Sequence, residues 1–153
     1  MIRVKFSVML VLVTIVSACW VSREPIPATS CYLIEVEDDP EKERIFDYGR
    51  QLLPMFNSFA VEHKLQVPSR EAPGGAYDYK NPEMGLMMTL TFGAGERRAL
   101  SAIYVDPEMS CSICDDFEEF MIEEVEQTFT VINCDEDEGF GGAVLYGVNL
   151  RKG

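Results

Sequence analysis

The sequence predicts an α+β domain in which helices pack on an antiparallel sheet. Several short segments are rich in β-branched and aromatic residues, and two longer segments carry apolar residues at helical spacing. Residues 86–92 give the clearest signal, because Leu86, Met88, Leu90 and Phe92 alternate with the side chains between them. That alternation is the period of a half-buried strand.

The first strand and the first helix are expected between residues 31 and 63. Residues 31–36 predict a strand, because Tyr32, Leu33, Ile34 and Val36 are β-forming residues. Asp39 followed by Pro40 is typical of a helix N-cap and first helical position. The following residues repeat at helical spacing and predict one apolar stripe: Ile45, Tyr48, Leu52, Met55, Phe56 and Phe59. Pro54 lies inside this stripe, so we expect a kink or a break near Leu53.

The rest of the chain predicts a loop, a hairpin, a second helix and further strands. Residues 65–81 contain prolines and paired glycines and predict a loop, with a short extended piece at 77–79. Residues 93–95 form the turn between strands 86–92 and 99–105. An amphipathic helix follows, with its apolar side at Phe117, Phe120, Met121, Val125 and Phe129. Residues 130–134 predict one more strand, and residues 143–150 offer an extra C-terminal strand.

The resulting order, β-α-β-β-α-β, resembles the split pattern of ferredoxin-like sandwiches. This resemblance implies an antiparallel sheet with two helices on one face. It implies no particular function, because this architecture supports many unrelated ones.

The N-terminus has the features of an export signal. Arg3 and Lys5 precede an uncharged stretch, residues 6–16, which is much shorter than the ~20 residues of a membrane-spanning helix. The next residues, Val16-Ser17-Ala18-Cys19, resemble the lipobox of bacterial lipoproteins. The resemblance covers residues 1–19 and implies removal of residues 1–18 and acylation of Cys19, with palmitate-type chains. The alternative is an ordinary signal peptide with a chance cysteine.

The same resemblance predicts where the protein resides. In Gram-negative lipoproteins an Asp after the lipidated cysteine usually retains the protein in the inner membrane, so Trp20 favours the periplasmic face of the outer membrane. We therefore expect three parts: a signal peptide (1–18), a lipidated tether (19–30) and a single α+β domain (31–153).

Composition limits the partners of the exported domain. Removal of residues 1–18 lowers Lys plus Arg from 13 to 11 against 26 acidic residues, so the mature net charge is 11 − 26 = −15. Such a charge repels the phosphates of nucleic acid and anionic headgroups, which leaves the lipid to hold the protein at the membrane. Composition does not exclude a partner protein in the cell envelope.

The four other cysteines form an even set in an oxidising compartment, which predicts disulfides. In the expected topology, Cys31 begins the first strand and Cys134 ends its antiparallel neighbour, so these two can pair. Cys111 and Cys114 would then pair with each other across the start of the second helix. The competing pattern joins Cys31 to one cysteine of the Cys111/Cys114 pair and Cys134 to the other.

A redox role for Cys111 and Cys114 is the alternative function. A strand, the motif Cys111-Ser112-Ile113-Cys114 and a helix together resemble part of a thioredoxin-type unit, over residues 102–135. No aromatic residue precedes Cys111 and no Pro-containing strand follows, which departs from that family. Asp115 and Asp116 would also raise a thiol pKa. A thiolate zinc site would need reduced cysteines and has no nearby histidine in sequence, so we expect no metal.

No other motif predicts catalysis or a cofactor. His63 is the single histidine, and a position at a helix C-terminus explains it without a catalytic set. Residues 135–139 have acidic side chains in a turn but lack the ligand spacing of a calcium loop. The sequence thus predicts a non-enzymatic binding or assembly module.

Overall fold

The computed structural model describes residues 24–36, 48–69, 75–93 and 97–151. Three sequence features lie outside these residues: the export signal with Cys19, the expected N-cap at Asp39-Pro40 with Ile45, and most of the turn at residues 93–95.

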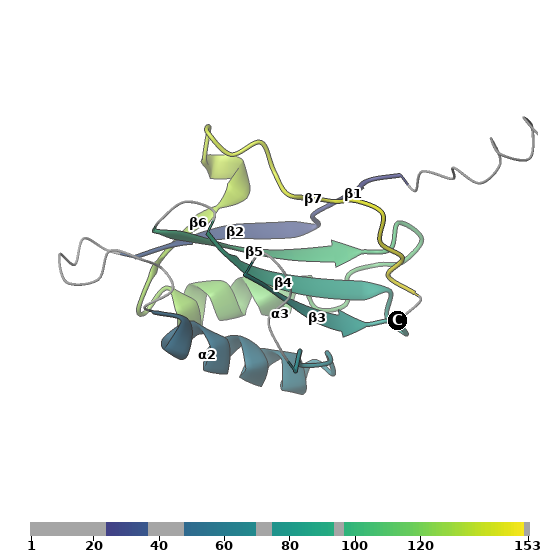
Figure 1. Cartoon of the computed structure of the whole chain (residues 1–153), viewed down its shortest axis with the longest axis horizontal. Coiled ribbons are helices and arrows are strands. Elements are labelled where there is room, and N and C mark those ends of the chain that lie inside the picture. Colours follow the sequence, from purple (N-terminus) through teal and green to yellow (C-terminus); the bar gives the residue numbers. More distant parts are fainter. Residues whose placement is uncertain (1–23, 37–47, 70–74, 94–96, 152–153) are drawn as a thin grey trace, which may run out of the picture.

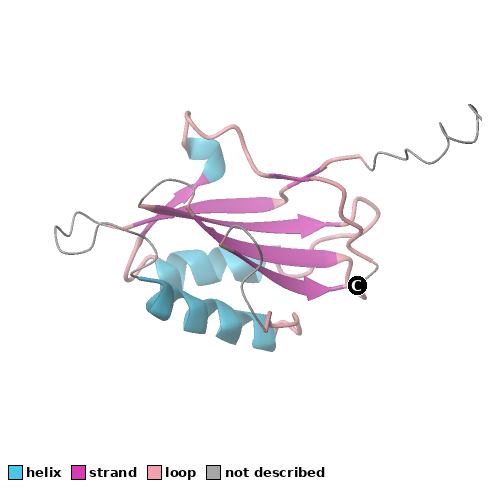
Figure 2. Cartoon of the chain, viewed as in Figure 1, coloured by secondary structure: helices cyan, strands magenta, loops and turns pink. Residues whose placement is uncertain are grey.

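The structure is built around a five-stranded antiparallel sheet with the strand order β3-β4-β5-β2-β6 (Figures 1 and 2). Two helices lie on one side of this sheet, which confirms the predicted α+β class. The sheet strands and helices are β2 (Ser30–Glu35), α2 (Gly49–Glu62), β3 (Ala76–Asn81), β4 (Leu86–Phe92), β5 (Arg98–Val105), α3 (Cys114–Phe120), and β6 (Thr130–Asn133).

Short elements complete the chain. A π-helical turn, η2 (Met121–Val125), extends α3, and a 3₁₀ turn, η3 (Cys134–Glu136), follows β6. The two-residue strands β1 (Ile26–Pro27) and β7 (Val144–Leu145) pair antiparallel and form a separate small sheet. We call this pair the β1–β7 ribbon.

Both faces of the sheet are covered. The main core lies between the sheet and the helices and includes Ile34, Phe56, Met88 and Phe117. The opposite face packs against the C-terminal segment in a smaller cluster: Met87, Ala102, Tyr104, Ala143 and Leu150. Strand β4 is therefore buried on both faces along most of its length, whereas its alternating sequence predicted one wet face.

The segment expected to be a loop contains the edge strand β3, which is longer than the predicted extended piece. Its six residues pair with β4 from Ala76 opposite Thr91 to Asn81 opposite Leu86. Tyr79 is fully buried, and its hydroxyl donates a 2.9 Å hydrogen bond to Asn57 Oδ1 on α2. Burial raises the pKa of Tyr79 well above its usual range, so this donor stays protonated. Pairing with a distant strand and this bond to α2 explain why β3 forms.

Pro54 does not break the first helix. Helix α2 continues through Pro54 to Glu62, and Pro54 itself is exposed. A proline inside a helix removes one hydrogen bond and costs about 3 kcal/mol. Leu52 and Phe56, on either side of Pro54, are fully buried, and packing of this kind can offset the cost.

The expected tether is only partly free of the domain. Ile26 pairs with Leu145 and Pro27 with Val144, and Ala28 N–H donates to the Ala143 carbonyl at 2.8 Å. Residues 26–28 thus belong to the folded unit. The extra C-terminal strand expected at 143–150 is limited to the two residues of β7, because the rest of that segment covers the sheet instead of joining it.

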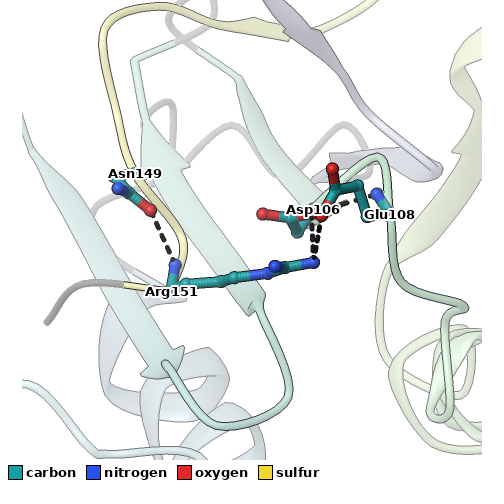
Figure 3. Close-up of polar contacts among 4 residues, drawn as sticks. All are labelled: Asp106, Glu108, Asn149 and Arg151. Atoms are coloured by element: carbon teal, nitrogen blue, oxygen red, sulfur yellow. Dashed lines mark hydrogen bonds and ion pairs between the residues drawn. The ribbon is translucent and has the colours of Figure 1, made fainter.

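The C-terminal segment ends in a polar clamp on the residues that follow β5 (Figure 3). The guanidinium of Arg151 lies 3.1 Å from the Asp106 carboxylate and 3.0 Å from that of Glu108. Gly85, in the turn between β3 and β4, has a positive φ of 57° and accepts a 2.8 Å hydrogen bond from Asp106 N–H. A Cβ at Gly85 would lie 3.0 Å from Asp106 Cβ, so glycine is required there for both backbone and space.

We expect Gly85→Ala to lower the free energy of unfolding by about 2–4 kcal/mol, since left-handed strain and overpacking both contribute. Gly147→Ala is the matched control, because Gly147 has a similar φ of 68° and nothing within 4 Å of an added Cβ. It should cost about 1–2 kcal/mol from strain alone. Urea denaturation of the mature domain measures both, and equal losses would contradict the role given to the close contacts.

Candidate functional site

The four cysteines of the domain converge at one end of the sheet. Cys31 is the half-buried second residue of β2, and Cys134 follows directly after β6, the antiparallel neighbour of β2. Their Cα atoms are 5.4 Å apart, and those of Cys111 and Cys114 are 5.6 Å apart. Both spacings suit a disulfide. The members of each predicted pair are thus adjacent, and their oxidation in the protein stays a prediction.

A pocket of about 250 Å³ lies between the two cysteine pairs. Cys31 and Cys114, one from each pair, both line it. Asp115, Glu118 and Asp135 also line it and make its surroundings acidic. The cysteines predicted from sequence therefore share one site, which we call the cysteine pocket.

Cys134 is the least accessible of the four cysteines. It is buried, with 3% of its surface exposed, whereas Cys31, Cys111 and Cys114 are all half-buried. Tyr32 in the pocket wall is also buried, and burial raises the pKa of its hydroxyl, helped by the nearby carboxylates of Glu118 and Glu136. The pocket wall thus offers a neutral hydroxyl, and its carboxylates disfavour a neighbouring thiolate.

A second hollow, which the sequence did not predict, lies between α2 and the α3–η2 helix. This groove has a volume of about 310 Å³ and is lined by Phe59, Glu62, His63, Asp116, Glu119, Phe120, Glu123 and Glu124. Its five carboxylates give it a strongly negative potential, which favours cations over anions.

His63 lies in this acidic groove at the end of α2. Its ring packs on Phe59 with centroids 4.2 Å apart, and its Nδ1 lies 3.6 Å from the Asp116 carboxylate on α3. The groove lining contains no serine, threonine or cysteine. His63 therefore connects the two helices and has no nucleophile beside it in the groove.

The acidic turn after β6 has a structural explanation. Asp137 forms a 2.8 Å ion pair with Arg98 of β5, and its Oδ1 accepts a hydrogen bond from Gly139 N–H. Arg98 also pairs with Glu35 of β2. Among the residues that the structure describes, no group of three or more histidine, cysteine or acidic side chains is arranged to hold a metal ion.

Comparisons with protein-family models, with curated proteins and with solved structures found no match to this chain. Within the described part of the chain, no helix is long and apolar enough to cross a bilayer.

We expect the two disulfides to differ in their effect on stability. Replacing Cys31 and Cys134 by Ser opens a loop with a sequence separation of 103 and should cost about 4–5 kcal/mol in the chain-entropy model. Replacing Cys111 and Cys114 opens a separation of only 3 and should cost about 2 kcal/mol. Urea denaturation under non-reducing conditions compares the two double variants. If the Cys31/Cys134 variant matched the unmodified domain, that bridge would not form in the protein.

Proposed function

We propose that the mature protein is a lipid-anchored envelope protein that faces the periplasm and acts as a binding or assembly module. The observation that carries this proposal is Val16-Ser17-Ala18-Cys19, placed directly after a short uncharged stretch with a positive start. Acylation of Cys19 and cleavage before it would hold the domain at the membrane, most stably with two or more chains. In a Gram-negative host, Trp20 after the lipidated cysteine supports a location at the outer membrane.

Two features support binding over catalysis. His63, the single histidine, contacts Phe59 and Asp116 in a groove whose lining offers no nucleophile. The mature charge of 11 − 26 = −15 favours a partner with a complementary basic surface and excludes nucleic acid. The partner we propose is therefore another envelope component, with the lipid as the contact to the membrane and no cofactor.

We also propose that β2, α2, β4, β5, α3 and β6 form a ferredoxin-like unit, to which β3 adds an edge strand. The order β4-β5-β2-β6 within the sheet supports this assignment, and so does the side-by-side placement of α2 and α3 (Figure 1). In this view Cys31–Cys134 and Cys111–Cys114 are structural disulfides at one end of the sheet.

Replacing Cys19 by Ala should release the protein from membranes, because the anchor is the acyl group and the domain is too acidic to bind headgroups by charge. The measurement is fractionation of cells in high salt, combined with mass analysis of the N-terminal peptide. A variant with Cys111 and Cys114 replaced by Ser is the matched control and should stay with the membrane. Membrane retention of the Cys19→Ala protein would contradict the anchor.

The alternative function is thiol–disulfide exchange by Cys111 and Cys114 on the membrane-tethered domain. Their partial exposure favours it, and so does the pocket that Cys114 shares with Cys31. The acidic neighbours Asp115 and Glu118 count against it, since they disfavour a thiolate.

Titration in glutathione buffers of known potential separates the two functions. We expect both bridges to resist reduction until below about −300 mV, as inert disulfides do. Opening of Cys111–Cys114 between about −120 and −230 mV, with Cys31–Cys134 intact as the internal control, would instead establish the exchange function.

A further inference from the structure

The β1–β7 ribbon lies in an uncharged part of an otherwise acidic protein. Charged residues make up 25% of the chain, yet residues 25–34 and residues 139–150 contain none. Pairing of β1 with β7 places these two stretches side by side. Figure 1 shows the ribbon on the side of the sheet opposite the helices.

Large apolar side chains are exposed at this ribbon. Tyr146, directly after β7, has 72% of its surface exposed, and Val144 in β7 has 41% exposed. Pro25 and Pro27 on the facing stretch are exposed as well. The ribbon therefore presents apolar and aromatic side chains, and its own residues carry no charge.

The ribbon is also tied closely to the expected lipid. Ile26, the first residue of β1, is only seven positions after Cys19 in the sequence. A fully extended chain covers at most about 3.6 Å per residue, so the ribbon cannot lie farther than about 25 Å along the chain from the acylated cysteine. Among the elements that the structure describes, no other begins so near to the anchor in sequence.

We propose that the β1–β7 ribbon, with Tyr146 and Val144, contacts the phospholipid headgroup and acyl boundary beside the lipid anchor. The proposal rests on the lipid anchor proposed above. An apolar body with a polar tip suits tyrosine to this boundary. Carboxylates brought within a Debye length of about 8 Å of anionic headgroups are repelled, so the two uncharged stretches that form the ribbon are favoured for this approach.

This contact would fix the orientation of the domain relative to the membrane. Because α2 and α3 lie on the opposite side of the sheet from the ribbon, the acidic groove between them would open away from the membrane (Figure 1). Partners that approach from the periplasm would then meet the groove and its carboxylates, and the ribbon would be hidden from them.

Tryptophan quenching in vesicles tests the contact. The lipidated full-length mature protein, with Trp20→Phe to remove the single natural tryptophan, is placed in phosphatidylcholine vesicles whose acyl chains are brominated near the headgroup. Tyr146→Trp reports on the ribbon. Val61→Trp is the matched control, because Val61 lies on α2 and has 69% of its surface exposed. Both positions are exposed, so a larger side chain fits without repacking the core.

We expect the brominated lipid to quench the tryptophan at position 146 about twofold or more strongly than the one at position 61, since tyrosine and tryptophan settle at the interface. Equal quenching at the two positions, in protein whose N-terminal peptide carries acyl chains, would overturn the ribbon contact and leave the anchor intact. An N-terminal peptide without acyl chains would overturn the anchor, and the ribbon contact with it. A blue shift at position 146 that follows protein concentration and ignores lipid would overturn the contact in favour of a second copy of the chain.

Discussion

The position of β2 between β5 and β6 is the constraint on which the rest of the structure depends. Its register pairs Cys31 with Ala102 on one side and Tyr32 with Asn133 on the other. The same strand sends Tyr32 and Ile34 into the helix-covered core, where Tyr32 packs edge-on against Phe117 of α3. Loss of this register by one residue would turn those side chains to the other face and separate Cys31 from Cys134.

Sequence alone predicted the elements whose signals are local. Strand β4 lies where the alternation predicted a strand, although both of its faces are buried, and the second helix agreed because Phe117, Phe120 and Met121 share one side. Strand β3 was underestimated because its pairing with β4 and the bond from Tyr79 to Asn57 are non-local. Pro54 predicted a kink or a break in the helix, but the helix continues because Leu52 and Phe56 pack in the core.

The acidic groove could not be predicted, since Glu62 and Asp116 come together only when α2 and α3 pack side by side. Glu119 and Glu123, four residues apart on one side of a helix, were the only partial signal of it in the sequence.

Two arginines of this acidic domain, Arg98 and Arg151, lie at joints between distant segments. Arg98 connects Glu35 on β2 with Asp137 after η3, and Arg151 connects the end of the C-terminal segment with Asp106 and Glu108 after β5. Both arginines are about 40% exposed, so each pair adds little to stability by itself. Their value is in position, because each neutralises carboxylates that would otherwise repel one another where separate segments meet.

The short β1–β7 pairing has a mechanical consequence for an anchored domain. A pulling force applied at Cys19 reaches β1 first, and two paired residues offer little resistance to being peeled away. With Cys31 bonded to Cys134, the peeling would stop at Cys31, because the covalent link transfers the load to the end of β6. At most twelve residues, or about 43 Å of chain, could then extend before the sheet carries any tension. Residues 19–31 would thus extend under load, and the Cys31–Cys134 disulfide would keep the force from unfolding the core.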